Sequence, residues 1–499
     1  MRHEGTSAGD PGALPGTVDT LLGVRLSDAL PSGTVGREVV TLLGIVEDLA
    51  GTRGYYAAMA EAGRHLRALR SLHSRARRFV GDALHNIVRL LRRLRLLALA
   101  ASDADRSPSR RPSAAVLYSI WLYEQQVPAV DPAASLRTPL APLLAQKGLS
   151  PQRLQAARLQ LADRLARIAN LPLDEQIDVL GEALSYPAWL VRSFVEAFGA
   201  DGAGLDRVLA ILRAQNERAP LCVRVNRLRA AREHVADRLR QEGLIAHPTA
   251  LASDGLYLDG HENVYATQTF AEGLVELQDE GSQLIAELCA PPPGGIVVDA
   301  CAGAGGKTLA LGALLQGRGR LLALDIERHK LDELVRRARR AGLSNVQALA
   351  VPETWTLDGG ATNLPSWLRA SLADRVLVDA PCSGLGVLRR NPEARWRLQA
   401  ADLAELATTQ LRILLGAAQL VRPQGRLIYS TCTVLPLENE QVVARFLAMR
   451  PDFQTVPIKD IFGASRARGC SDPDGMYLRT LPRPGGPDGF FAAVLRRVS

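Results

Sequence analysis

From Gly295 to the C-terminus, short apolar segments alternate with helical stretches. The apolar segments are IVVDA, RLLALD, RVLVDA and GRLIYSTC, and helical stretches such as KLDELVRRARRAG stand between them. Repeated strand–helix units predict a parallel, doubly wound α/β sheet, because each helix carries the chain back so that the next strand can run parallel to the last. Ligands of such sheets bind at the carboxyl ends of the strands. We therefore expect an α/β domain over residues 276–499, with its site beyond the strand ends.

The sequence before this domain has a different pattern. Residues 1–35 are rich in Gly, Pro, Ser and Thr and have no sustained period, so we expect a mobile tail. Apolar residues then recur at steps of three and four, as in LHNIVRLLRRLRLLALA, which predicts an all-α domain over 36–180. The strand-like LCVRVN and the helical REHVADRLRQEG follow Pro220, so we expect 181–275 to form a helical linker and a small α+β connector.

The protein is basic, and its charge is unevenly distributed. The 499 residues carry a net charge of +8, and residues 53–112 alone contain 14 Arg and four acidic residues. Such a segment attracts polyanions, and Arg binds phosphate with two hydrogen bonds. A solvated helix face is an equal alternative, because the chain uses 56 Arg but only four Lys. Charge alone leaves contact with nucleic acid undecided.

Several other classes of protein are disfavoured. No run of about 18 uncharged apolar residues is present and the N-terminus has no apolar leader, so we expect a cytoplasmic protein without membrane contact. The six cysteines include no CxxC pair, which disfavours a zinc ribbon, and a reducing compartment would keep them as free thiols. We expect a monomer that binds no metal.

A glycine-rich loop lies between the first strand of the α/β domain and the next helix. Within DACAGAGGKT it comprises Cys301, Ala302, Gly303, Ala304, Gly305, Gly306 and Lys307. Glycines let a ligand approach the backbone, and the helix N-terminus offers unpaired N–H groups. A phosphate-binding loop of the Walker type would need Gly where Cys301 stands. Asp325 ends the second strand, where an acid binds ribose hydroxyls, so loop and acid together fit NAD or S-adenosylmethionine.

Two further strands end in reactive side chains. Asp379 and Cys382 follow RVLV, and Cys432 follows GRLIYST. Because the strand ends of a doubly wound sheet converge, we expect one carboxylate and two thiols to face the same cleft. Buried structural cysteines are the alternative, since Cys is commonly buried. Against this alternative, both cysteines begin loops that contain Ser, Thr and Pro.

Together these segments resemble the Sun/RsmB-type RNA cytosine-C5 methyltransferases. The matching stretches are DACAGAGGKT, LALD, DAPCSGLGVLRRNPEARW, STCTVLPLENEQ and DGFFAAVL, within about residues 270–499. The resemblance implies a Rossmann-like domain that binds S-adenosylmethionine through the loop from Cys301 to Lys307, Asp325 and Asp379. The basic helical region is similar to the NusB-like domain of the RsmB branch. This similarity implies RNA as the partner, with 16S ribosomal RNA as the expected substrate.

The resemblance also implies a role for each reactive residue. Carbon 5 of cytosine is a poor nucleophile until a thiolate adds at C6, and this thiolate would belong to Cys432. Asp379 would hydrogen-bond the base edge and relieve charge at N3. Cys382 would help to release the enzyme after methyl transfer. Nothing adjacent to Cys432 in the sequence shows how its thiol is activated.

Some positions depart from the family pattern. Ala304 stands where Pro is usual, and the usual acid after the third strand falls at Pro352. Either the neighbouring Glu353 replaces this acid, or the contact is absent. Further candidates for RNA contact are Arg389, Arg390 and Arg395, with a solvated loop as the alternative, and Arg224 and Asn226 of the connector.

Three alternatives stay open at this point. The substrate could be tRNA or another RNA instead of 16S ribosomal RNA. A DNA cytosine methyltransferase would use Cys382 as its nucleophile, and the second cysteine, Cys432, favours RNA. A non-catalytic RNA-binding assembly factor would keep a vestigial cofactor pocket, and the intact Lys307, Asp379 and cysteines argue against it.

Overall fold

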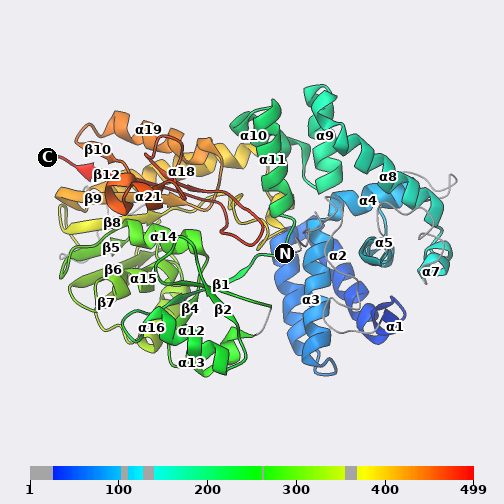
Figure 1. Cartoon of the computed structure of the whole chain (residues 1–499), viewed down its shortest axis with the longest axis horizontal. Helices are drawn as coiled ribbons and strands as arrows, with labels where there is room; N and C mark the ends of the chain where they lie inside the picture. Colours follow the sequence, from blue (N-terminus) through cyan, green and yellow to red (C-terminus); the bar gives the residue numbers. More distant parts are fainter. Residues whose placement is uncertain (1–25, 103–110, 127–139, 261–262, 354–367) are drawn as a thin grey trace, which may run out of the picture. The chain divides into compact units, whose positions relative to one another are not determined.

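The computed structural model describes residues 26–102, 111–126, 140–260, 263–353 and 368–499 (Figure 1). The chain divides into two compact units. The first, called here the helical unit, comprises the chain up to Asn216 together with Asn391–Leu398. The second, called the sheet unit, comprises Glu217–Arg390 and Gln399–Ser499. No helix within the described ranges is long and apolar enough to cross a membrane.

The helical unit is built from helices joined by turns. These are α1 (Leu26–Ala29), α2 (Thr34–Ala68), α3 (Ser74–Arg89), α4 (Leu91–Ala101), α5 (Ala114–Gln126), α7 (Ala141–Gln146), α8 (Pro151–Ala166), η1 (Ile168–Asn170), α9 (Leu173–Leu184), α10 (Ala188–Phe198), α11 (Gly202–Ala214) and α17 (Ala394–Arg397). The chain bends within α2 at Gly54, whose φ of 75° is not helical. Helices α3 and α8 begin where His73 and Ser150 accept hydrogen bonds from backbone N–H groups of the first turn.

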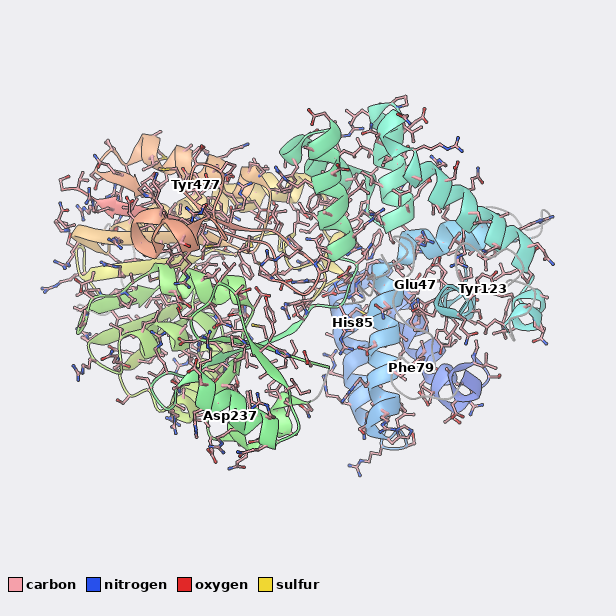
Figure 2. The ribbon with its side chains drawn as sticks, in the orientation of Figure 1. Glu47, Phe79, His85, Tyr123, Asp237 and Tyr477 are labelled. Carbon is pink, nitrogen blue, oxygen red and sulfur yellow. The ribbon has the colours of Figure 1, made fainter. Side chains whose placement is uncertain are left out.

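Aromatic and aliphatic side chains fill the core of the helical unit. Phe79 of α3 meets Trp121 of α5 edge to face, with ring centroids 6.1 Å apart. Figure 2 labels Phe79 and Tyr123, both buried in this core. The predicted helical character of the N-terminal part is confirmed. Helix α1 lies within the predicted tail 1–35, whose first 25 residues are outside the described part, and α10 and α11 belong to this unit although the sequence analysis places them in a linker.

The arginines of the basic segment fall into two groups. Arg93 and Arg95 form ion pairs inside the helical unit, with Glu124 and Glu47 respectively. Others are exposed around the turn between α2 and α3, namely Arg67, Arg70 and Arg75. Among the described residues, the charge that a polyanion can reach is therefore smaller than the sequence total, and three of the exposed arginines lie near this turn.

A short segment from the C-terminal half of the chain completes the helical unit. Arg395 of α17 is fully buried, and its Nη1 donates to three oxygens at 2.9–3.2 Å, those of the Arg89 and Ser185 backbones and the Asn216 side chain. The neighbouring Trp396 donates its indole N–H to a backbone carbonyl of α3 at 2.6 Å. The interpretation of Arg395 as a phosphate contact is therefore wrong, because this side chain satisfies carbonyl groups inside a core.

The sheet unit begins with a small antiparallel sheet. Its strands are β1 (Leu221–Val225), β2 (Ala246–Pro248), β3 (Gly255–Leu258) and β4 (Val275–Leu277), in the order β2-β3-β1-β4. Helix α12 (Arg232–Gln241) packs Val235 and Leu239 onto the strand residues Val223 and Val225. Short helical turns η2 (Val264–Ala266) and α13 (Gln268–Ala271) lead into β4. This is the small α+β element that the sequence predicts after Pro220.

The larger sheet has the order β10-β12-β9-β8-β5-β6-β7, and β11 pairs with β12. Its strands are β5 (Ile296–Asp299), β6 (Arg320–Asp325), β7 (Val346–Ala350), β8 (Ala373–Asp379), β9 (Val421–Thr431), β10 (Phe453–Val456), β11 (Leu478–Thr480) and β12 (Phe490–Arg497). The strands from β9 to β7 pair in parallel, and β10, β11 and β12 pair antiparallel. The predicted doubly wound α/β fold is confirmed, with an antiparallel edge that the strand–helix pattern does not reveal.

Helices cover both faces of this sheet (Figure 1). They are α14 (Glu280–Leu288), α15 (Gly306–Leu314), α16 (Arg328–Ala341), α18 (Ala400–Ala418), α19 (Glu440–Met449), α20 (Lys459–Phe462) and α21 (Ala464–Ala467). Successive strand residues enter opposite layers: Val298 packs in the layer that contains Leu414 of α18, and Val297 packs in the layer that contains Leu284 of α14. Burial on both faces explains why these strands are continuously apolar in the sequence.

We predict that Arg395→Ala lowers the free energy of unfolding of the helical unit by about 3 kcal/mol, because it removes the donor to three oxygens, two of them buried backbone carbonyls, and opens a cavity. Thermal unfolding followed by circular dichroism measures the change. The matched control is Arg397→Ala in the same short helix, whose side chain is exposed. This control should stay within about 0.5 kcal/mol of the wild type. Equal losses in the two variants would contradict the anchoring role.

Candidate active site

Four parallel strands deliver the site residues to one edge of the larger sheet. Strands β9, β8, β5 and β6 are neighbours in this order. β5 ends at Asp299, β6 at Asp325, β8 at Asp379 and β9 at Thr431. Because parallel strands end on the same side of a sheet, the loops that follow them meet there. The structure thus brings together the loops that contain all the predicted catalytic and cofactor-binding residues.

The glycine-rich loop is fixed against the end of β6. The Gly303 N–H donates to Asp325 Oδ2 at 2.7 Å, and the Ala302 N–H donates to the carbonyl of Leu324 at 2.9 Å. Gly305 has a φ of 91° and precedes α15. A Cβ at this position would lie 2.6 Å from the Leu334 side chain. Only glycine fits there, since both the backbone conformation and the space exclude a side chain.

Side chains from outside the loop hold its carbonyl groups. Arg337 donates to the Ala304 carbonyl at 2.7 Å, and Arg224 of β1 donates to the Gly306 carbonyl at 2.9 Å. Burial lowers the pKa of Arg224 to about 10, which leaves it charged at neutral pH. Asn226 donates its amide to the carbonyls of Gly273 and Ala341. The interpretation of Arg224 and Asn226 as RNA contacts is wrong, because both side chains are buried and hold the small sheet and the loop in place.

The residues around Asp325 suit a nucleoside. One carboxylate oxygen accepts from Gly303 and the other from the Glu327 N–H, at 2.9 Å, so the acid is held in a defined position while it stays partly exposed. The next side chain, Ile326, is an exposed large hydrophobic residue. A fixed acid beside an open apolar surface offers hydrogen bonds to ribose hydroxyls and a contact for a base. Sequence reasoning overlooked Ile326, although its position directly after Asp325 could have indicated it.

Lys307 and Asp379 form an ion pair at the centre of this edge. Lys307 Nζ lies 2.6 Å from Asp379 Oδ2, and Ser430 donates its hydroxyl to Asp379 Oδ1 at 3.0 Å. Burial alone would lower the pKa of Lys307, but the Asp379 carboxylate more than offsets it and raises this pKa above its usual value. Lys307 also interacts electrostatically with Cys432. The ammonium group is therefore the nearby positive charge that the sequence around Cys432 does not supply.

The two predicted catalytic cysteines lie in contact. Their sulfur atoms are 3.4 Å apart, and the backbone N–H of Cys432 donates to Cys382 Sγ at 3.3 Å. Both side chains are half-buried, whereas Cys289 and Cys470 are buried in the core. The hydrogen bond with Cys432, together with burial, raises the pKa of the Cys382 thiol well above its usual range. Two half-buried thiols in contact beside an ion pair are therefore candidates for catalysis.

The loop after Cys382 is held by buried ion pairs. Arg389 and Arg390 both pair with Asp488, and Arg390 also reaches Asp279 Oδ2 at 2.9 Å. The Arg389 and Asp488 side chains are fully buried. The interpretation of Arg389 as a phosphate contact is therefore wrong, because its guanidinium group is buried and paired. Arg390 is exposed, so its contact with phosphate stays a prediction.

Two other expectations concern ligands at the periphery of the site. Glu353 is exposed after β7, and its backbone carbonyl accepts a hydrogen bond from Arg412 at 2.8 Å. The next residues, 354–367, lie outside the described part of the chain, so whether Glu353 replaces the missing acid stays an open prediction. Among the described residues, no group of three or more His, Cys, Asp or Glu side chains is arranged to hold a metal ion.

Residues 286–496 match the family described as 16S rRNA methyltransferase RsmB/F, and residues 186–265 match the ferredoxin-like domain of RsmF/B-like methyltransferases. Over 427 residues the chain is 32% identical to a Synechocystis protein named "Probable ribosomal RNA small subunit methyltransferase B", covering 85% of this chain and 91% of that protein. The chain belongs to the RsmB/F family. This confirms the resemblance inferred from the motifs.

Other relatives agree with membership of the RsmB/F family. Ribosomal RNA small subunit methyltransferase B of Vibrio cholerae is 33% identical over 62% of this chain and 65% of its own length. The crystal structure of a methyltransferase homolog from Pyrococcus horikoshii is 25% identical, with a TM-score of 0.52, and covers 68% of this chain and 99% of its own. As an RsmB/F protein, the chain is an RNA methyltransferase that uses S-adenosylmethionine, the predicted cofactor.

A buried acid at the end of β5 makes stability depend on pH. Asp299 is fully buried and accepts a hydrogen bond from Thr308 Oγ1 at 2.7 Å. Burial raises its pKa from 3.8 to about 7. Between pH 3.8 and about pH 7, Asp299 keeps its proton in the folded state, whereas the unfolded chain has released it. Stability therefore falls as pH rises through this window and stays lower above about pH 7.

We predict that Asp299→Asn stabilises the protein relative to the wild type by about 2 kcal/mol more at pH 8 than at pH 5, since the amide need not be deprotonated above pH 7. Thermal unfolding at the two pH values measures the difference. Asp237→Asn is the control, because Asp237 lies on the exposed side of α12 (Figure 2). If Asp299→Asn shifted the melting temperature equally at both pH values, Asp299 would not be the titrating group.

Proposed function

We propose that this protein transfers a methyl group from S-adenosylmethionine to carbon 5 of a cytosine in 16S ribosomal RNA, through a covalent bond between Cys432 and C6. The contact between the two thiols, 3.4 Å apart beside the Lys307–Asp379 pair, is the observation that carries the proposal. Cytosine methylation at C5 requires a nucleophile at C6 and a group that assists its departure. The choice of 16S ribosomal RNA rests on the matched family and on the relatives named as small-subunit enzymes.

The arrangement supports a stepwise assignment of roles. Cys432, which interacts electrostatically with the Lys307 ammonium, adds to C6 through its sulfur and makes C5 nucleophilic. S-adenosylmethionine supplies the electrophilic methyl group. Asp379 hydrogen-bonds the base edge, and the charge of Lys307 beside it offsets the negative charge that develops at N3. After methyl transfer the C5 proton passes to water, its bonding electrons re-form the C5–C6 double bond, and the C6–S bond breaks with its electron pair returning to the Cys432 sulfur. Cys382, whose raised pKa keeps it a thiol, lies 3.4 Å from this sulfur and would protonate it as it leaves.

The cofactor would bind along the loop from Cys301 to Lys307. The backbone of Ala302, Gly303 and Ala304 is fixed by bonds to β6 and Arg337, so the loop presents a formed surface. Asp325 would hold the ribose, with Ile326 against the base, and Asp379 would border the methyl-donor end. Cys301 is half-buried, and burial raises the pKa of its thiol, which fits a packing role beside the cofactor.

The RNA would enter with its target base unstacked, because a base within a helix cannot reach this edge of the sheet. The helical unit is proposed to be NusB-like and to contact RNA through the exposed arginines at the α2–α3 turn, including Arg67, Arg70 and Arg75. Exposure of these guanidinium groups supports the proposal. The arginines that pair with Glu47 and Glu124 are excluded from it.

We predict that Cys432→Ala abolishes methyl transfer, because the variant lacks the sulfur assigned to attack C6, and the remaining Cys382 stays a thiol. Cys382→Ala should instead accumulate a covalent protein–RNA adduct, seen as a slower band on a denaturing gel, because the C6–S bond forms but is not released. Cys470→Ala, which removes a buried thiol outside the site, is the control and should retain activity. An active Cys432→Ala variant, or a Cys382→Ala variant that turns over without adduct, would refute the assigned roles.

The substrate is tested with labelled S-adenosylmethionine offered together with 16S ribosomal RNA, tRNA or duplex DNA. Transfer to 16S ribosomal RNA, with the modified cytosine located by bisulfite sequencing, is the expected result. Transfer to duplex DNA that depends on Cys382 would reveal a DNA enzyme, and transfer to tRNA would replace the proposed substrate. Calorimetry that detects no binding of S-adenosylmethionine would point to a non-catalytic RNA-binding assembly factor.

A further inference from the structure

A buried carboxylate links the two loops that carry the cysteines. Glu438 ends η3 (Pro436–Glu438), six residues after Cys432, and is fully buried. Its oxygens accept hydrogen bonds from the Ser383 backbone N–H at 2.9 Å and from the Ser383 hydroxyl at 2.5 Å. Ser383 directly follows Cys382 in the chain. One side chain from the Cys432 loop therefore holds the backbone of the Cys382 loop.

A second contact joins the loops one residue beyond each cysteine. The Ser383 hydroxyl oxygen lies 3.1 Å from Thr433 Oγ1, and Thr433 directly follows Cys432. Ser383 has one hydroxyl proton, so it can donate this proton to Glu438 and accept one from Thr433. Both residues are buried, at 2% and 0% exposure. The two loops are thus cross-linked by hydrogen bonds immediately beside the sulfur atoms.

The carboxylate is itself supported from the core. Gln410 of α18 donates its amide to Glu438 Oε2 at 2.9 Å and to the Pro381 carbonyl at 3.0 Å. The Tyr429 hydroxyl of β9 donates to the Glu438 carbonyl at 2.5 Å. Gln410 and Tyr429 are fully buried. Every member of this network belongs to the sheet unit, and no atom of Glu438 is available to a substrate or cofactor.

The energetics argue for a specific role of this charge. Burying a carboxylate is unfavourable unless hydrogen-bond donors compensate it, and an apolar side chain would fill the same space without that cost. In return, charge-assisted hydrogen bonds in a dry interior are strong and directional, so a satisfied network fixes one geometry. The geometry fixed here is the relation between the Cys382 and Cys432 loops.

We propose that Glu438 is a positioning residue for methyl transfer, which holds the Cys382 loop against the Cys432 loop so that the two sulfur atoms remain in contact. This inference rests on the proposed function, because it assigns both thiols to one reaction. The negative charge of Glu438 also acts on Cys382, where it adds to the effects of the Cys432 hydrogen bond and of burial that raise the pKa of this thiol.

Two substitutions at Glu438 separate the effect of its hydrogen bonds from the effect of its side-chain shape. Glu438→Ala removes every side-chain bond between the carboxylate and Ser383. Glu438→Gln keeps the shape: its oxygen can replace Oε2, and its N–H group can donate to the Ser383 hydroxyl, which then donates to Thr433. Glu440→Ala is the matched control in the next helix, since Glu440 pairs with Arg479 and not with the cysteine loops.

We expect Glu438→Ala to lower kcat about 100-fold, because a misplacement of reacting groups by about 1 Å costs this much. The KM for RNA and the Kd for S-adenosylmethionine should stay within about twofold, since Glu438 contacts neither. Glu438→Gln should restore kcat to within about fivefold of the wild type, and Glu440→Ala should match the wild type. In a Cys382→Ala background, Glu438→Ala should also slow formation of the covalent adduct in a single turnover.

A wild-type kcat in Glu438→Ala would overturn the inference, as would a Glu438→Gln variant as impaired as Glu438→Ala. Loss of S-adenosylmethionine binding in Glu438→Ala would show that this variant does not fold. In that case Ser383→Ala tests the positioning role, because it removes only the hydrogen bonds of the Ser383 hydroxyl. This variant should lose about tenfold in kcat, and an unchanged kcat would equally overturn the inference. If the wild-type chain neither methylates RNA nor forms an adduct, the proposed function fails instead.

Discussion

The parallel pairing of β8 with β5 on one side and β9 on the other is the constraint on which the site depends. Val298 of β5 lies opposite Val376 of β8, and Leu377 of β8 lies opposite Ile428 of β9. This register places the ends of all three strands at one edge. Lys307, in the first turn of α15, can therefore reach Asp379 at the end of β8 across a single strand spacing. A shift of the register would separate the ion pair and the two thiols together.

Buried arginines do much of the structural work in this protein. Arg389 meets Asp488 in the interior, Arg395 satisfies carbonyl groups in the helical unit, and Arg224 holds the Gly306 carbonyl. The guanidinium group suits such positions because its fixed donors can satisfy several oxygens at once. In a chain with 56 Arg, many of these positive charges are therefore unavailable to a nucleic acid. The exposed arginines at the α2–α3 turn, by contrast, are accessible to a nucleic acid.

The segment after the Cys382 loop connects two parts of the chain. It leaves the sheet unit after Arg390, contributes α17 to the helical unit, and returns at Gln399 before α18. Its two ends are held in different ways. Arg390 is fixed by Asp488 and Asp279, whereas Arg395 is fixed by backbone carbonyls of the helical unit. A single stretch of sequence thus serves the Cys382 loop, an ion-pair network and a helical core.

The sequence alone determined the order of strands and helices, the glycine-rich loop and the residues at the strand ends, because these depend on local periodicity and short motifs. It placed Asp325, Asp379, Cys382 and Cys432 at one edge through a general property of parallel sheets. Only the tertiary structure decided which charges are buried and how the thiols are held. Glu438 meets Ser383 across 55 residues of chain, and Lys307 meets Asp379 across 72. Such pairs follow from which strands are neighbours, and hydrophobic periodicity contains no information about neighbours.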